Sequence, residues 1–330
     1  MTHKKPTQVC IYGAGAIGGW MGVKLARIGC QVSVVARGAT LDALQHNGLQ
    51  LHEDGQTLTA AVQASASPVT LGVQDLVIVA VKAPALADVA RQIAPLIGPN
   101  TVVLTAMNGV PWWFFHGFGD ALAGTQLSTI DPTGEIEHAI PAAHVVGCVV
   151  HASCAVDVPG VIRHHFGNGL IIGEPSGVPT ERVTQLAALL AEAGFTTSVS
   201  AQIQKDIWYK LWGNMTVNPI SALTGATTDL ILKDDLVREF VSRIMLEAKE
   251  IGVRLGIPIA QQPEDRHAIT LKLGAFKTSM LQDVEANKPI ELDGLVTVVK
   301  ELGALTQVET PFTDALLGLA RLHARGRGLY

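Results

Sequence analysis

The sequence has few charged residues, few cysteines and no long apolar run. Charged residues make up 16% of the 330 residues, and Asp plus Glu outnumber Lys plus Arg by 29 to 24. The chain therefore carries no positive field that would attract a nucleic-acid backbone. Apolar runs such as 76–81 are soon interrupted by a charge, far short of the ~20 residues that span a bilayer. We expect neither nucleic acid nor a membrane as a partner.

Cysteine and histidine are arranged without the spacing of a metal or redox site. The four cysteines form no CxxC pair, and the histidines, densest over 144–165, occur without an HExxH pattern. We therefore predict no metal site and expect Cys148 and Cys154 to be buried small hydrophobes. The N-terminus, MTHKKPTQ, has no signal-peptide pattern, so we expect a cytoplasmic protein with reduced thiols.

The residues that are abundant indicate a globular chain of about two domains. Apolar residues make up 48% of the sequence, too many for a disordered chain. The first half alternates β-branched runs with amphipathic stretches, the order typical of a parallel sheet covered by crossover helices. The expected strands are 9–12, 31–35, 76–81 and 101–105, and the expected helices are 16–28, 40–47 and 85–97.

The second half changes to helical periodicity. Before that change we expect added antiparallel strands over 145–150, 161–166 and 169–172, then a helix over 179–193 and a strand over 195–199. Helices are predicted over 202–218, 230–255, 264–286, 292–306 and 313–324. The prediction is an α/β domain over 1–200 and an all-helical domain over 201–330. Apolar faces of these helices either pack on one another or form a homodimer interface, and the sequence leaves both open.

A glycine-rich turn follows the first expected strand and opens the first helix. It reads Gly13-Ala14-Gly15-Ala16-Ile17-Gly18. Gly13 permits a tight turn, Gly15 lets a pyrophosphate approach the backbone, and Gly18 lets helix and strand pack closely. Helix N-terminal amides then face the anion. In this context the motif predicts a Rossmann-type dinucleotide-binding domain, with a purely structural turn as the alternative.

The end of the second expected strand bears on the choice of dinucleotide. An NAD-preferring domain places a carboxylate about 20 residues after the turn, whereas this chain has Val35-Ala36-Arg37. A guanidinium pairs bidentately with a 2′-phosphate, and no carboxylate stands there to repel it. The sequence therefore favours NADP(H), with a solvated surface charge as the alternative for Arg37.

A polar stripe runs along an apolar, aromatic helix in the second half. Lys210, Asn214 and Asn218 are spaced at i, i+4 and i+8 and so share one face. Because burial without partners would cost several kcal/mol, this face must meet water, a polar network or a ligand. Desolvation lowers a lysine pKa toward the range that protonates a developing alkoxide. The alternative is an ion pair from Lys210 to Asp206, with the asparagines as caps near Pro219.

Together these motifs resemble the ketopantoate reductase family, NADP-dependent 2-dehydropantoate 2-reductases with an N-terminal Rossmann domain and a helical C-terminal domain. The resemblance runs from end to end. It is carried by GAGAIG, Arg37, Val81-Lys82, Asn108-Gly109, the KxxxNxxxNP segment over 210–219, SMLQD over 279–283 and ELD over 291–293.

The resemblance implies roles for individual residues. Lys210 would be the proton donor to a small-molecule 2-keto acid that receives a hydride from NADPH, and Asn108 and Glu291 would complete the catalytic set beside the nicotinamide. The implied substrate-binding residues are Asn214, Asn218, Ser279 and Thr228. The implied cofactor-binding residues are those of the turn over 13–18, with Arg37, Lys82, Asn108, Ser153 and Glu291.

Departures from the family pattern concern the pocket. Ala85 stands where many relatives have Gln, Thr228 where they have Asn, and an aromatic run over 112–115 follows Asn108-Gly109. That run either packs in the core or covers the cleft. Reduction of a 2-keto acid is therefore a firmer expectation than 2-dehydropantoate as the substrate. The alternatives are a β-hydroxyacid dehydrogenase-like oxidoreductase and a non-catalytic NADP(H)-binding sensor.

Overall fold

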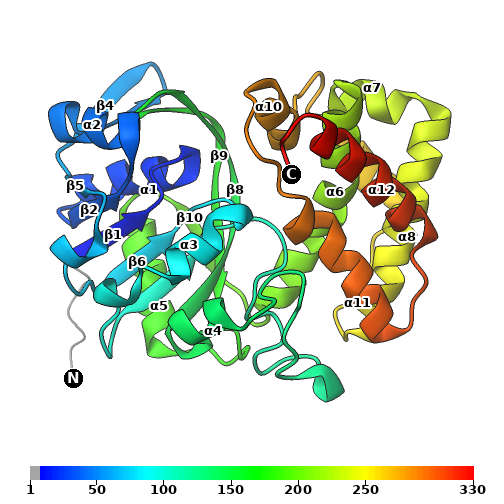
Figure 1. The fold of residues 1–330 in the computed structure, drawn as a ribbon, viewed down its shortest axis with the longest axis horizontal. Coiled ribbons are helices and arrows are strands. Elements are labelled where there is room, and N and C mark those ends of the chain that lie inside the picture. Colours follow the sequence, from blue (N-terminus) through cyan, green and yellow to red (C-terminus); the bar gives the residue numbers. More distant parts are fainter. Residues whose placement is uncertain (1–7) are drawn as a thin grey trace.

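The computed structural model describes residues 8–330. The expectation of no signal peptide is based on residues 1–8, and all of these except Gln8 lie outside the described range. Two halves stand side by side, an α/β half and a helical half (Figure 1). In the described chain every strand ends by Val199, and from Ile203 onward the elements are helices. The α/β fold class with a helical C-terminal part is confirmed, while the domain boundary at residue 200 stays a prediction.

All strands within residues 8–330 belong to one ten-stranded sheet in the order β4-β3-β9-β8-β7-β6-β1-β2-β5, with β10 paired to β9. The strands are β1 (Gln8–Tyr12), β2 (Gln31–Val35), β3 (Leu49–Glu53), β4 (Gln56–Ala60), β5 (Gln63–Ser65), β6 (Leu76–Val79), β7 (Val102–Thr105), β8 (Val145–Val158), β9 (Val161–Gly173) and β10 (Thr196–Val199). The strands β2, β1, β6 and β7 run parallel in register, so that Tyr12 lies beside Val35 and Val79. Their carboxyl ends consequently open onto one edge.

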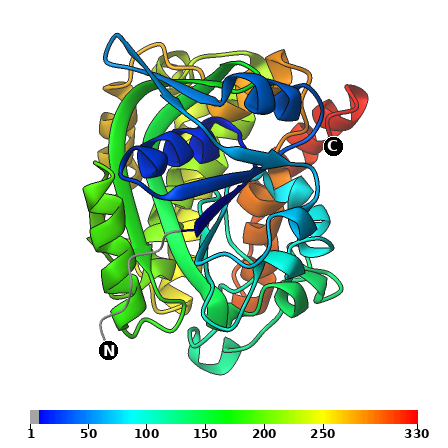
Figure 2. The ribbon, with the colours of Figure 1, turned by 90° about the vertical axis from the view of Figure 1, so that its left-hand side faces the viewer.

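Alternating apolar residues bury both faces of this sheet. Val9 and Ile11 pack with α1 (Ala16–Arg27) and α5 (Glu181–Glu192) on one face. Cys10 and Tyr12 point to the other face and join the core that includes the short helices α3 (Leu86–Ala90) and α4 (Glu135–Ala139). Figure 2 shows this layering. The second core continues into the helical half through Ile203 and Ile207, so the two halves share buried apolar contacts.

The first half differs from the sequence prediction in two places. The helix expected over 85–97 is wrong: only α3 is α-helical, and 3₁₀ turns at Ala83–Ala85 and Ala94–Leu96 flank it. Pro84 and Pro95 lie in those turns, where proline disfavours a helical residue before it and removes an N–H donor. The strands β3, β4 and β5, which follow α2 (Gly38–Asn47), were not predicted.

The added strands are longer than predicted. The segments expected over 161–166 and 169–172 form one strand, β9, and β8 extends to Val158. Their antiparallel pairing is confirmed, with register shifts between His151 and Ser153 and beyond. Each also pairs in parallel with another neighbour, β8 with β7 and β9 with β3 and β10.

The helical half is built around one long central helix. Its helices are α6 (Ile203–Thr224), α7 (Thr228–Lys233), α8 (Asp235–Arg254), α9 (Pro263–Leu271), α10 (Ser279–Glu285), α11 (Val298–Thr306) and α12 (Pro311–Gly326). Two predicted helices are split, one at Asp234, which caps α8, and one at 272–278. Leu236 and Leu322 stay 79% and 70% exposed, and the homodimer interface stays a prediction. Within residues 8–330 no helix has the length and apolar character to cross a membrane.

Candidate active site

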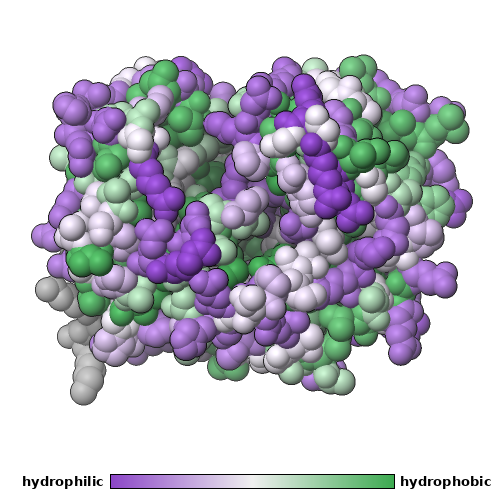
Figure 3. Space-filling model, viewed as in Figure 1, coloured by the Kyte–Doolittle hydropathy of each residue, from purple (hydrophilic) through white to green (hydrophobic). Residues whose placement is uncertain are grey.

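The carboxyl ends of the parallel strands face the helical half across a hollow that Figure 3 shows between the two parts of the surface. At this edge the chain after β1 makes the glycine-rich turn. Gly13 has φ +99°, and a Cβ there would lie 2.7 Å from Val81 Cγ1. A Cβ on Gly18 would lie 2.1 Å from the carbonyl oxygen of Gly13. Both positions therefore require glycine for the turn and the helix to pack.

Gly15 differs from the other two glycines because nothing lies within 4 Å of the position its Cβ would take. It is the N-cap of α1, has no side-chain cap, and is followed by a first turn without an acidic residue. The first amides of this twelve-residue helix thus face open space. A dinucleotide diphosphate fits such a cradle, because the helix dipole and free N–H groups stabilise an anion.

Arg37 lies at the other end of this edge, as the N-cap of α2. Its side chain is 58% exposed, and Nη1 lies 3.8 Å from Oδ2 of Asp88. An ion pair this exposed contributes little to stability, so the guanidinium is free to meet a phosphate. The structure thus leaves open both interpretations of Arg37.

Lys210 lies on α6 where this helix passes the middle of β8. Its Nζ donates to Oδ1 of Asn108 at 2.7 Å and to the carbonyl oxygen of Val150 at 2.6 Å. Asp206 instead accepts from the Ser200 hydroxyl. The alternative of a Lys210–Asp206 ion pair is therefore wrong. Because α6 continues to Thr224, the asparagines are not its caps either.

Burial lowers the pKa of Lys210 to about 8, since an ammonium loses its hydration in the interior. The carboxylate of Glu291 acts in the opposite direction, while the nearby guanidinium of Arg266 lowers the pKa further. A lysine in this range exists in both protonation states near neutral pH. It suits proton transfer to an oxygen.

Asn108 is held in place by a contact between the two halves. The next residue, Gly109, has φ +87°, and a Cβ there would lie 2.4 Å from the carbonyl oxygen of Gly294. The amide of Val110 donates to that same oxygen at 3.0 Å. Gly294 belongs to a π-helical turn, Asp293–Thr297, that leads into α11. The π-turn and the glycine together fix the loop that carries Asn108.

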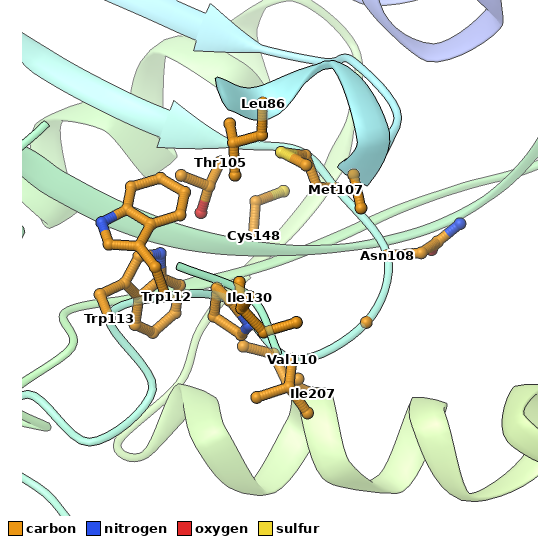
Figure 4. Close-up of a pocket in the computed structure, with 13 residues that line it drawn as sticks. Leu86, Thr105, Met107, Asn108, Val110, Trp112, Trp113, Ile130, Cys148 and Ile207 are labelled. Atoms are coloured by element: carbon orange, nitrogen blue, oxygen red, sulfur yellow. The ribbon is translucent and has the colours of Figure 1, made fainter. Parts of the chain in front are cut away.

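The aromatic run after this loop packs in the core rather than covering the cleft. Residues 112–115 are each 5% exposed or less. Trp112 and Trp113 line a small apolar cavity together with Thr105, Ile130, Cys148 and Ile207, and the Asn108 side chain points away from it (Figure 4). Burial raises the pKa of Cys148 to about 12, so this thiol stays protonated and is a packing group.

Two polar links join the loop after β6 to the helical half. Oε1 of Glu291 accepts from the amide of Ala83 at 3.0 Å, and Lys82 forms an ion pair with Asp283. Burial raises the pKa of Glu291, although the Ala83 amide and the lysines Lys82 and Lys210 oppose this shift. Glu291 therefore lies within electrostatic reach of Lys210.

The remaining predicted site residues fall into two groups. Asn214 is half-buried and Asn218 is buried, and neither side chain hydrogen-bonds to another residue in the described chain. Ser279 is exposed at the start of α10, which packs against α6. Thr228 is different, since its hydroxyl donates to the carbonyl oxygen of Gly274 within the helical half. Ser153 is half-buried on β8, opposite Phe166.

Two charged or titratable residues near Lys210 were not predicted. Arg266 on α9 and His151 on β8 both lie close enough to interact electrostatically with Lys210. Burial lowers the pKa of His151, and Lys210 and Arg266 lower it further. A single arginine in an amphipathic helix gives no sequence signal, because most such residues are solvated. Among residues 8–330 no group of three His, Cys, Asp or Glu side chains is placed to hold a metal.

A Rossmann-type sheet with an open phosphate turn, facing a half-buried lysine of lowered pKa, defines a nicotinamide-dependent oxidoreductase. Sequence comparison gives the particular group. The family described as "Ketopantoate reductase PanE/ApbA" matches residues 9–116, and its C-terminal counterpart matches residues 202–324. The chain belongs to the ketopantoate reductase family, as its motifs predicted.

Similar proteins extend over the whole chain. A 2-dehydropantoate 2-reductase from Mesorhizobium japonicum is 48% identical over 324 residues, which cover 98% of this chain and 99% of the relative. A crystal structure from Ralstonia solanacearum MolK2, also assigned to the ketopantoate reductases, has a TM-score of 0.95 at 56% identity and 98% and 99% coverage. A PanE/ApbA family ketopantoate reductase from Ralstonia eutropha JMP134 has a TM-score of 0.82 at 25% identity and 97% and 99% coverage.

Proposed function

We propose that the protein reduces the keto group of a 2-keto acid with NADPH, and that 2-dehydropantoate is its substrate. The observation that carries the reaction class is Lys210, which is half-buried, has a pKa of about 8, and hydrogen-bonds to Asn108 and to the carbonyl oxygen of Val150. The substrate assignment is supported by the 48% identity to a 2-dehydropantoate 2-reductase along the full chain.

The residues at the strand edge fit a nicotinamide dinucleotide phosphate. The turn over 13–18 would hold the diphosphate, Arg37 the 2′-phosphate, and Lys82 with Glu291 and Ser153 the nicotinamide half. When bound, this cofactor supplies the hydride. Asn108 stands between this edge and α6, where its amide oxygen accepts from Lys210.

Lys210 handles the proton in this proposal. Its ammonium donates a hydrogen bond to the substrate carbonyl, stabilises the negative charge that develops on that oxygen, and then transfers its proton there. Asn108 and the Val150 carbonyl fix the direction of Nζ. Burial favours the neutral amine that remains.

Asn214 and Asn218, which have no side-chain partner within residues 8–330, would hold the polar groups of the substrate together with Ser279. Thr228, whose hydroxyl already donates to Gly274, would shape the same pocket from behind.

The test of this function is NADPH oxidation by the purified protein with 2-dehydropantoate, beside pyruvate, 2-oxoisovalerate and an aryl 2-keto acid. Fast turnover selective for 2-dehydropantoate supports the proposal in full. Faster turnover of another 2-keto acid supports the proposed reaction but assigns it a different substrate. Tight NADPH binding with no turnover of any keto acid contradicts the proposal and favours a sensor. Oxidation of 3-hydroxy acids with NADP⁺ favours a β-hydroxyacid dehydrogenase.

The pH dependence of reduction follows from the protonation of Lys210. We expect kcat/KM to be level at neutral pH and to fall as the pH rises through about 8, because the neutral amine has no proton to give. Oxidation of the 2-hydroxy acid by NADP⁺ needs the neutral amine and should rise over the same range. Steady-state rates in both directions check this. A reduction profile that stays level well above this pH would contradict the assignment of Lys210.

Cofactor choice is tested by Arg37→Ala. The loss of a charge-assisted pair to the 2′-phosphate should raise the Kd for NADPH about tenfold or more and leave the Kd for NADH unchanged. Fluorescence titration with both cofactors measures this. Arg91→Ala is a matched control, because Arg91 is also exposed and also pairs with Asp88. If Arg37→Ala raised the Kd for NADPH and NADH by the same factor, Arg37 would not be the residue that recognises the 2′-phosphate.

A further inference from the structure

Arg266 is packed against the helix that carries Lys210. Its Cζ lies 5.2 Å from the ring centroid of Tyr209. A Cβ on Gly213 would lie 2.8 Å from Nε and 2.9 Å from Nη2 of Arg266. Gly213 is three residues after Lys210, less than one helical turn away. The missing side chain at this position is therefore what lets a guanidinium reach the backbone of α6 beside the lysine.

The guanidinium of Arg266 has no hydrogen-bond or ion-pair partner in the described chain. Its Nε is fully buried with no hydrogen-bond partner, and no carboxylate in the described chain lies within ion-pair distance of Arg266. Arg182 gives the contrast, since it pairs with Glu174 and donates to two backbone carbonyl oxygens. A buried N–H group without an acceptor is costly. Arg266 as a whole is half-buried, so the rest of its guanidinium is open to an anionic ligand.

Titratable groups from two other elements lie near Arg266. Lys210 from α6 and His151 from β8 both lie within its electrostatic reach, and its charge disfavours protonation of each. The carboxylates of Asp206 and Glu291 act in the opposite direction, on His151 and on Lys210 respectively. Arg266 from α9 and Lys210 from α6 thus bring two cationic side chains into one region.

We propose that Arg266 binds the carboxylate of the 2-keto acid substrate. The proposal rests on the reductase function above and assigns the anchor of its anionic end. A guanidinium matches a carboxylate with two parallel N–H···O bonds. In a 2-keto acid the carboxylate is bonded directly to the carbonyl carbon, so its anchor must lie near the proton donor, and Arg266 lies against Gly213, three residues after Lys210. The bound carboxylate also offsets the repulsion between the two cations and keeps the lysine protonated for its step.

The test compares a charged substrate with its neutral counterpart. In Arg266→Met, kcat/KM for 2-dehydropantoate should fall at least about tenfold, mostly through KM. Its neutral lactone, 2-dehydropantolactone, should be reduced at nearly the wild-type rate. Arg254→Met is the matched control, because Arg254 is an exposed arginine paired with Glu250. If Arg266 had a merely structural role, Arg266→Met would lower kcat/KM for both substrates by the same factor, and that result would overturn the proposal.

Binding without turnover separates this proposal from the function on which it rests. Calorimetry of pantoate and pantolactone on the NADP⁺-saturated enzyme should show that Arg266→Met weakens pantoate alone, and that Arg266→Lys recovers part of the loss. Gly213→Ala, which crowds the guanidinium, should have the same selective effect if Arg266→Met fails to fold. If Arg266→Met weakens pantoate binding alone in a protein that reduces no keto acid, the proposed function is refuted and the carboxylate site is supported. If the protein reduces keto acids but Arg266→Met does not weaken pantoate binding selectively, or if pantoate does not bind at all, the carboxylate site is refuted.

Discussion

Lys210→Met is expected to lower kcat for keto acid reduction by about 10³-fold and to leave NADPH affinity unchanged. Methionine keeps the length and volume of the side chain but provides neither a positive charge nor a proton to the developing oxyanion. Because Lys210 contacts Asn108 and Val150 rather than the phosphate turn, the cofactor should bind as before. Steady-state kinetics give kcat, and NADPH fluorescence titration gives the affinity.

Lys205→Met is the matched control for this substitution. Lys205 lies on the same helix but is exposed, so its loss should leave kcat within the error of the assay. The pH profile adds a second reading, since the fall in rate above about pH 8 should be absent from the residual activity of Lys210→Met. A Lys210→Met enzyme that keeps its kcat within about tenfold, with the same pH profile, would show that another group donates the proton.

The parts of the fold that the sequence predicts well are those set by local pattern. The strand β2 agrees at both ends with the prediction, and α1 begins at the predicted Ala16, because β-branched runs and a glycine-rich turn fix these elements over a few residues. The strands β3 to β5 have at most five residues each, and β4 and β5 lie at the two edges of the sheet. β3 and β4 form a hairpin that joins the sheet through the pairing of β3 with β9, and β5 joins it through β2. Periodicity within one segment does not reveal pairing with a distant strand.

In the helical half, the prediction missed breaks between helices. Apolar periodicity continues across a break that depends on a single residue, so the segment predicted as one helix over 230–255 forms two helices. Asp234 ends the first and caps the second by accepting from the amide of Val237. Pro219 has the reverse effect, because α6 continues past it to Thr224. The packing of α6 among its neighbours outweighs the local preference of proline.

The candidate site divides in a similar way. Spacing along one helix predicted that Lys210, Asn214 and Asn218 share a face, and only the family resemblance suggested Asn108. The second acceptor of Lys210 is a backbone carbonyl of β8, for which no residue type gives a signal. Arg266 is recognisable only when Gly213 is known to lie against it. Residues brought together across the cleft thus need the tertiary structure to be recognised.

Gly15→Ala should weaken NADPH binding at least about tenfold while leaving the melting temperature nearly unchanged. Gly15 has φ −76°, which alanine adopts without strain, and its added methyl group meets no protein atom within 4 Å. The methyl group instead occupies the space through which a diphosphate approaches the helix amides. Fluorescence titration and thermal unfolding measure the two effects separately.

Gly18→Ala should instead lower the melting temperature. Its methyl group would lie 2.1 Å from the carbonyl oxygen of Gly13 and 2.9 Å from Cγ2 of Ile11, so helix and strand must move apart at a cost of roughly 1–3 kcal/mol in unfolding free energy. Thermal unfolding without cofactor should therefore distinguish the two variants at once. If Gly15→Ala lowers the melting temperature as much as Gly18→Ala and NADPH still binds normally, the turn is structural and the dinucleotide lies elsewhere. A stable Gly15→Ala protein that no longer binds NADPH places the diphosphate against the first amides of α1.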